Sequence, residues 1–157
     1  MVRLADLTDG ERDFLLGKLK ELSGFDGHPW VTGPRLNKRR VAIITTSGIH
    51  RAGDRPFADG AAASDYRVMP GSVSAGDLVM SHLSTNYDRS GFQQDINVVF
   101  PIDRLKELAA EGVIGASADY HYSFMGAAPP RSLESKARQL AGLLEKDRVD
   151  AVLLTPV

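Results

Sequence analysis

The apolar run at residues 41–46 constrains the fold of this chain more than any other segment. It reads Val-Ala-Ile-Ile-Thr-Thr and shows no alternation of apolar and polar side chains. Such a run is typical of a strand that is buried on both faces of a parallel sheet. It leads directly into the turn Ser47-Gly48. We therefore predict an α/β fold with this strand in the interior.

Helical and extended patterns alternate after this strand. Residues 132–146 are predicted to form an amphipathic helix, because apolar residues recur there at positions 133, 137, 140 and 144. A second helix is predicted after Pro101, with Gly112 placed to end it, and a strand is predicted over 149–154. This alternation indicates a mainly parallel sheet with flanking helices, a Rossmann-like layer. We assign residues 41–157 to this domain and residues 1–40 to an N-terminal helix and loop.

The remaining segments give weaker signals. Thr8 and Glu11 have the spacing of a capping box, and leucines at 15, 19 and 22 continue a helix that Ser23-Gly24 would end. Short strands are predicted over 66–69 and 78–81. The apolar run 96–100 is interpreted as a further buried strand, closed by Pro101.

Composition excludes several classes of function. The chain carries 19 basic and 20 acidic residues, so it offers no electrostatic reason to bind nucleic acid or an anionic membrane. Its apolar runs are too short to cross a bilayer and its N-terminus lacks the apolar core of a signal peptide, so we expect a cytoplasmic protein. Cysteine is absent, which rules out a disulfide or a thiolate nucleophile within these 157 residues.

Metal and nucleotide sites have little support. The four histidines, at positions 28, 50, 82 and 121, do not show the spacing of a metal site, and we predict none. Gly48 follows a strand, but the sequence contains neither G-x-G-x-x-G nor G-x-x-x-x-G-K. We therefore expect no cofactor in this chain.

Six segments, in order, resemble the selenoprotein B-type subunits of the glycine, sarcosine, betaine and D-proline reductases. The longest is Asp-Ile-Asn-Val-Val-Phe-Pro-Ile-Asp-Arg-Leu at 95–105. The others lie at 43–50, 66–70, 79–82, 107–126 and 149–157. In size the chain is most similar to the selenocysteine subunit of D-proline reductase.

The resemblance implies an oxidoreductase that cleaves a carbon–nitrogen bond in D-proline, or in glycine, sarcosine or betaine. A selenolate would attack the α-carbon, and a thiol would then form a selenenyl-sulfide. The implied partners are a subunit with a pyruvoyl group, a thiol or thioredoxin-like reductant and a small amino-acid substrate. We expect an oligomer.

In this family the selenocysteine follows the last of these strands, which would place it directly after Val157. Since UGA encodes selenocysteine and is commonly taken for a stop, we hypothesise that the chain is a truncated selenoprotein, inactive as written, with an incomplete sheet. A naturally short paralogue and a deliberately shortened chain are the alternatives. The second functional hypothesis is a catalytically dead binding or regulatory module that kept the scaffold and lost the nucleophile. A general thiol or selenol oxidoreductase is a third, weaker hypothesis.

The resemblance and the predicted sheet together suggest site residues. Carboxyl ends of neighbouring parallel strands meet at one edge, so Thr45, Thr46 and Gly48 are expected near Thr155 as substrate-binding residues. Two more substrate-binding candidates, Asp95 and Asn97, lie in the longest matched segment, although Asn97 could instead satisfy backbone groups. The candidate catalytic residues, as proton donors to the leaving amine, are His50, His82 and His121. One of His50 and His121 is expected to be a packed structural histidine.

Overall fold

The computed structural model describes residues 3–21, 27, 31–57, 63–83 and 89–157. The chain divides into two compact units, Met1–Thr32 and Gly33–Val157. The domain boundary between residues 40 and 41 stays a prediction. No helix in the described ranges is long and apolar enough to cross a membrane.

The first unit contains the short 3-10 helix η1 (Leu4–Asp6) and helix α1 (Asp9–Glu21). The predicted capping box is confirmed. The backbone N–H of Thr8 donates to Glu11 Oε2 (3.1 Å), and that of Glu11 donates to Thr8 Oγ1 (3.5 Å). The Thr8 hydroxyl also donates to Glu11 Oε2 (2.7 Å). This bond and, next, the one from the Thr8 backbone N–H hold the pKa of Glu11 below its ordinary value. The predicted helix end at Ser23-Gly24 lies outside the described residues.

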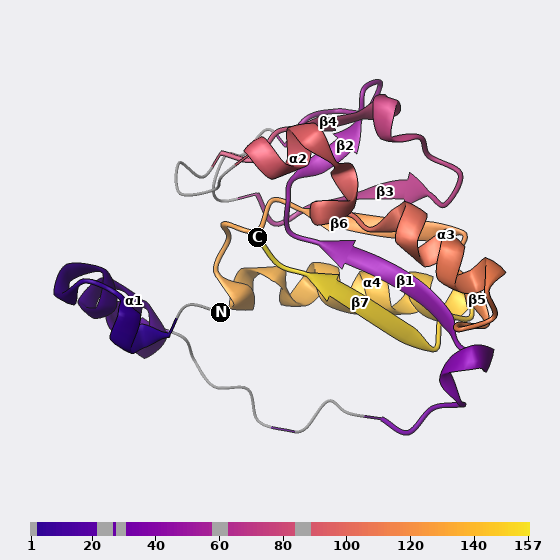
Figure 1. The fold of residues 1–157 in the computed structure, drawn as a ribbon, viewed down its shortest axis with the longest axis horizontal. Helices are drawn as coiled ribbons and strands as arrows, with labels where there is room; N and C mark the ends of the chain where they lie inside the picture. The colour runs from indigo at the N-terminus through magenta and orange to yellow at the C-terminus, as the bar shows by residue number, and fades with distance from the viewer. Residues whose placement is uncertain (1–2, 22–26, 28–30, 58–62, 84–88) are drawn as a thin grey trace. The chain divides into compact units, whose positions relative to one another are not determined.

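The second unit is built on a five-stranded sheet with β1 (Arg40–Thr45) in its interior (Figure 1). On one side β1 pairs with β7 (Ala151–Thr155), and on the other with β5 (Ala116–Ser117) and β6 (Tyr120–Phe124). All three neighbours run parallel to β1. β3 (Tyr66–Pro70) pairs with β6 in the antiparallel direction. The α/β class is confirmed, and the sheet is mixed because β3 occupies one edge.

A separate two-stranded sheet stands next to this five-stranded sheet. It consists of β2 (Ile49–Arg51) and β4 (Leu78–Met80), paired antiparallel, with the 3-10 helix η4 (Ala75–Asp77) before β4. The strands predicted over 66–69 and 78–81 are confirmed as β3 and β4. Because β1 continues through the turn at Gly48 into β2, the two-stranded sheet begins where the main sheet ends.

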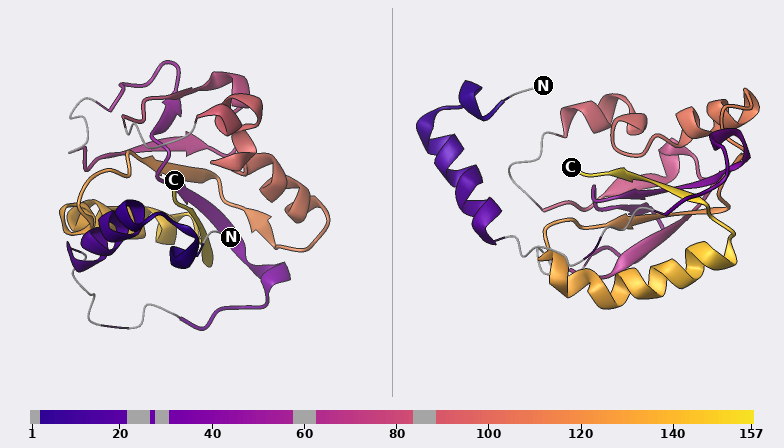
Figure 2. Two further views of the ribbon diagram at one scale, coloured as in Figure 1. Left: turned by 60° about the vertical axis from the view of Figure 1, so that its left-hand side comes forward. Right: turned by 90° about the horizontal axis from the view of Figure 1, so that it is seen from below.

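Helices cover both faces of the sheet (Figure 2). α4 (Glu134–Lys146), preceded by the 3-10 helix η6 (Pro130–Leu133), lies on one face. α2 (Ser90–Gln94) and α3 (Ile102–Ala110) lie on the other. The helices predicted after Pro101 and over 132–146 are confirmed. Another short 3-10 helix, η2 (Leu36–Lys38), precedes β1.

The sheet faces hold two apolar clusters. Ile43 packs with Ile102 and Leu105 on the α3 side, and each is at most 3% exposed. On the α4 side, Tyr122 and Leu140 belong to a second cluster. Burying a side chain of this size contributes about 1.5–3 kcal/mol, so these contacts account for the position of β1 between the helices.

The strand interpretation of residues 96–100 is wrong. Residues 96–98 form the 3-10 helix η5 (Ile96–Val98), whose N-terminus is capped by Asp95. Ile96 and Val99 are buried on one side of this turn, whereas Val98 is 63% exposed. The buried residues of this run therefore recur at helical spacing. The Asp95 side chain caps the first turn, so the segment forms a helical turn and not an extended strand.

Candidate functional site

Backbone hydrogen bonds of the turn at residues 46–48 bring the ends of four strands together at the carboxyl end of the parallel sheet. The backbone N–H of Thr46 donates to the carbonyl of Thr155 on β7 (3.2 Å). The N–H of Gly48 donates to the carbonyl of Phe124 on β6 (2.8 Å), and the carbonyl of Gly48 accepts from the N–H of Ser81 after β4 (2.9 Å). The ends of β1, β6, β7 and β4 therefore meet around one turn.

Two glycines permit this convergence. Gly48 has φ +64 and Gly126 has φ +81, both in the left-handed region that side chains disfavour. A Cβ on Gly126 would lie 2.6 Å from the carbonyl oxygen of Thr46, closer than real Cβ atoms approach. The end of β6 can therefore lie against the end of β1 only with glycine at position 126.

Three hydroxyl side chains lie in register across this edge of the sheet. Thr45 on β1 is directly opposite Ser123 on β6 and Thr155 on β7, and we call these three residues the hydroxyl row. Thr45 Oγ1 lies 2.9 Å from Ser47 Oγ and 3.2 Å from the carbonyl oxygen of Thr155. Thr155 Oγ1 donates to the carbonyl of Val99, which ties the row to the segment after η5 (3.0 Å).

Ser123 is the unsatisfied member of the row. Its side chain is fully buried, and its Oγ has no hydrogen-bond partner in the described part of the chain. A buried hydroxyl without a partner costs about 1–3 kcal/mol, so this position favours an added polar group. The register neighbour of Ser123 on β3 is Arg67, whose guanidinium binds Asp65 (2.7 Å) and stacks 4.3 Å from the centroid of Phe57.

His50 and His82 lie next to the turn, on the side of the two-stranded sheet. His50 Nδ1 is 2.8 Å from the carbonyl oxygen of Arg51, so this nitrogen carries a proton, and Nε2 is 2.7 Å from Ser81 Oγ. His82 follows Ser81, and its Cα would be 3.1 Å from a Cβ on Gly48. Burial, and secondarily the charge of Arg89, lowers the pKa of His82, which favours its neutral ring.

His121 lies in the core, away from the turn. Its Nδ1 accepts from the backbone N–H of Ile43 (2.9 Å), and its Nε2 is 3.3 Å from Ser117 Oγ. The ring packs edge-on against Phe100, and burial lowers its pKa to about 4. With both nitrogens engaged and no exposed surface, His121 has the features of a packed structural histidine.

Asp95 and Asn97 form a cap between η5 and α3. Asp95 Oδ1 accepts from the backbone N–H of Asn97 (2.9 Å), and this bond is the first cause of the lowered pKa of Asp95. Asn97 Oδ1 accepts from the backbone N–H of Asp103 (3.0 Å) in the first turn of α3. Both side chains therefore satisfy backbone donors at helix starts.

The structure thus gathers some of the expected residues and separates others. Thr45, Thr46, Gly48 and Thr155 meet at one edge, with His50 and His82 beside them, whereas His121 lies in the core. The sequence analysis missed Ser47 and Ser123, although both lie in the matched segments 43–50 and 107–126. No group of three or more potential metal ligands occurs among the residues the structure describes.

Comparison with known proteins identifies the family. Residues 27–157 match the family model of glycine/sarcosine/betaine reductase selenoprotein B. D-proline reductase subunit gamma of Acetoanaerobium sticklandii is 38% identical over 122 residues, which cover 76% of this chain and 49% of that protein. Glycine reductase complex component B subunit gamma of Symbiobacterium thermophilum is 34% identical over 127 residues, covering 76% of this chain and 29% of that protein.

Sarcosine reductase complex component B subunit beta of Peptoclostridium acidaminophilum is 33% identical over 125 residues, covering 76% of this chain and 28% of that protein. The chain therefore spans about half the length of the first relative and less than a third of the other two. No solved structure matches it significantly. The match of residues 27–157 shows that the chain belongs to the glycine/sarcosine/betaine reductase selenoprotein B family.

Proposed function

We propose that this chain supplies the substrate-facing part of an amino-acid reductase subunit that cleaves a carbon–nitrogen bond with a selenol or thiol. The observation that carries the proposal, beyond family membership, is the hydroxyl row with the unpartnered Ser123 Oγ. It lies at the carboxyl ends of parallel strands, where α/β proteins bind ligands. D-proline is the favoured substrate, because the D-proline reductase subunit is 38% identical; glycine, sarcosine and betaine are the alternatives.

The nucleophile comes from outside these 157 residues, which contain no cysteine. Expected on the segment after β7, it supplies a selenolate or thiolate that bonds to the substrate α-carbon while the C–N electron pair leaves with the amine. A thiol then bonds to the selenium, the carbon takes a proton, and a thioredoxin-like dithiol returns two electrons. On this proposal the 157-residue chain alone is inactive, and the pyruvoyl group that activates the amine belongs to a partner subunit.

The chain's own residues would bind the substrate and move a proton. The hydroxyl of Ser123 is suited to donate a hydrogen bond to a substrate carboxylate, and Thr45, whose hydroxyl contacts Ser47 and Thr155, would position the row. His82, with its lowered pKa, and His50 are the candidates for handling the proton of the leaving amine. His121 is left out of this role because both of its ring nitrogens are engaged in the core.

The first test is the nucleotide sequence after the codon for Val157. An in-frame UGA followed by an open frame with a nearby cysteine codon is expected. The full reading frame would then be expressed with the pyruvoyl-containing subunit, and 5-aminopentanoate formed from D-proline would be measured with a dithiol reductant.

Two variants test the site in that complex. Ser123→Ala is expected to lower kcat/KM at least about tenfold, since it removes a donor to the substrate, and Thr45→Val should lower it through the loss of the bonds that position Ser47 and Thr155. Ser135→Ala, on the exposed side of α4, is the matched control and should leave the rate unchanged. Equal rates for Ser123→Ala and Ser135→Ala would contradict the assignment of the hydroxyl row.

The second candidate function is a catalytically inactive binding or regulatory module on the same scaffold. It applies where no selenol- or thiol-bearing segment follows β7, since these 157 residues contain no cysteine. It predicts a different stop codon after Val157 with no open frame beyond. It also predicts that D-proline, glycine or betaine binds the chain at equilibrium without turnover in the complex.

A further inference from the structure

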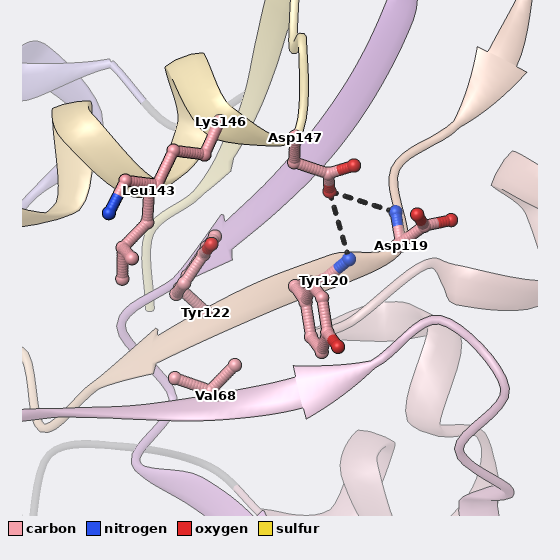
Figure 3. A pocket seen from close by; sticks show the side chains of 7 residues that line it. All are labelled: Val68, Asp119, Tyr120, Tyr122, Leu143, Lys146 and Asp147. Carbon is pink, nitrogen blue, oxygen red and sulfur yellow. Dashed lines mark hydrogen bonds between the residues drawn. The ribbon is translucent and has the colours of Figure 1, made fainter.

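A pocket of about 400 Å³ lies at the opposite end of the parallel strands from the hydroxyl row. It opens between β3, β6 and the C-terminal turn of α4 (Figure 3). Val68, Tyr122 and Leu143 form its apolar walls, with Tyr120 at its rim. Charged side chains complete the lining: Asp119, Lys146 and Asp147.

The pocket exists because α4 stops short of the end of the sheet. The helix ends at Lys146, and the chain turns away at Arg148 with φ +54. Val68 is in register with Tyr122, so both side chains share the face that α4 covers. Tyr122 is 2% exposed, whereas Tyr120, one step beyond the helix, is 48% exposed.

One end of the pocket carries net negative charge. Asp147 Oδ2 accepts from the backbone N–H groups of Asp119 (2.9 Å) and Tyr120 (3.2 Å), and its Oδ1 binds Arg40 (2.6 Å). Arg40 also binds Asp119 Oδ1 (2.8 Å). One guanidinium, with a single positive charge, therefore pairs with two carboxylates. The Asp119 side chain remains 75% exposed. This end therefore favours a cation.

The other end carries a positive charge. Lys146 is exposed, and no residue in the described ranges forms an ion pair with it. Figure 3 shows the ammonium of Lys146 and the carboxylate of Asp119 on opposite sides of the pocket. Tyr122 and Leu143 lie on the same side as Lys146. The pocket therefore has a negative end and a positive end with apolar side chains between them. A complementary ligand carries a cation at one end of an apolar chain and an anion at the other.

We propose that this pocket binds a linear ω-amino acid. Its ammonium would pair with Asp119, its carboxylate with Lys146, and its methylene chain would lie on Tyr122 and Leu143. An α-amino acid is a poorer fit, since its two charges sit on one carbon. This ligand class rests on the pocket alone. One further point rests on the proposed function: reductive opening of the proline ring at the α-carbon yields 5-aminopentanoate, a member of this class.

The test is titration of the 157-residue chain with 5-aminopentanoate, followed by the amide signals of Tyr120 and Tyr122 in nitrogen–proton correlation spectra. Pentanoate and pentylamine each carry one of the two charges and serve as comparison ligands. We expect 5-aminopentanoate to bind about two- to fivefold more tightly than either, the gain of one exposed ion pair. Equal binding of the three compounds, or no shift at Tyr120 and Tyr122, would overturn the proposal.

Matched variants locate the charges. Lys146→Met and Asp119→Asn are each expected to weaken 5-aminopentanoate binding about two- to fivefold. Lys38→Met makes the same change at another exposed lysine and should have no effect; an equal loss there would also overturn the proposal. If 5-aminopentanoate binds but the reconstituted complex does not convert D-proline, only the proposed function is contradicted. If the complex converts D-proline but 5-aminopentanoate does not bind at this pocket, only the proposed ligand of the pocket is contradicted.

Discussion

β1 and β7 have similar sequences and opposite burial. The strands are paired in register over five residues, from Val41 opposite Ala151 to Thr45 opposite Thr155. Ile43 in β1 is fully buried, whereas its partner Leu153 is 41% exposed, and Leu154 is 67% exposed. An apolar run therefore predicted the position of both strands, but it predicted the burial of β1 alone.

The difference comes from the neighbours of each strand. β1 has strands on both sides and helices α3 and α4 on its two faces. Within the described residues, β7 pairs with β1 alone. Side-chain burial in a sheet depends on what lies above, below and beside the strand, and local sequence carries none of that information.

The largest expected difference between the two strands is in core packing. Ile43→Ala should lower the free energy of unfolding by about 2–5 kcal/mol, because it leaves a cavity among Ile102, Leu105 and their neighbours. Leu153→Ala, at the register partner, should cost less than about 1.5 kcal/mol, because that side chain is already partly in water. Urea denaturation of both variants measures the contrast, and equal losses would contradict the burial of β1.

The second prediction concerns the histidine that holds the backbone of β1. The pKa of His121 is lowered to about 4 in the folded chain, against about 6.5 unfolded. Its neutral form thus stabilises the fold above pH 6.5, and this stability is lost as the pH falls from 6.5 towards 4. The loss between pH 7.5 and pH 5 should be about 2 kcal/mol. Denaturation of His121→Gln at both pH values should show a smaller dependence; an unchanged dependence would exclude His121 as its source.

The third prediction tests the hydroxyl row where β1 and β7 meet. Thr45→Val should lower the free energy of unfolding by about 1–2 kcal/mol, since Ser47 Oγ and its backbone N–H both lose Thr45 Oγ1 as a partner. Thr46→Val removes only the partly exposed bond from the N–H of Val157 (3.0 Å), and should cost less than about 0.5 kcal/mol. Thermal unfolding compares the two, and the reverse order would contradict the hydrogen bonds of the turn.

The smallest effect on stability is expected on β7 itself. Leu154→Lys should change the free energy of unfolding by less than about 0.5 kcal/mol, since Leu154 is largely in water. The same variant should reduce self-association, because exposed apolar strands at a sheet edge promote it. Sedimentation velocity at several concentrations checks this. A large loss of stability would mean that Leu154 is covered in solution.

Part of the candidate site followed from the sequence. The turn after the first strand, and its meeting with Thr155, follow from the rule that parallel strands end at a common edge. β6 was missed because His121 and Ser123 are polar residues that lie buried on one face of the strand, where a buried strand is expected to carry apolar side chains. Ser123 consequently could not be placed beside Thr45. His121 could not be distinguished from His50, because its partner Ile43 lies 78 residues away in the sequence.

The sequence by itself determined the α/β class, the two long helices of the second unit, the interior strand at 41–46 and the family. These depend on local periodicity and on motifs of neighbouring residues, which a single chain displays directly. Only the tertiary structure decided the strand order, the mixed direction of the sheet, the exposure of β7 and the pocket between Asp119 and Lys146. Each of these depends on contacts between residues far apart in the chain, and such contacts are fixed by packing in three dimensions.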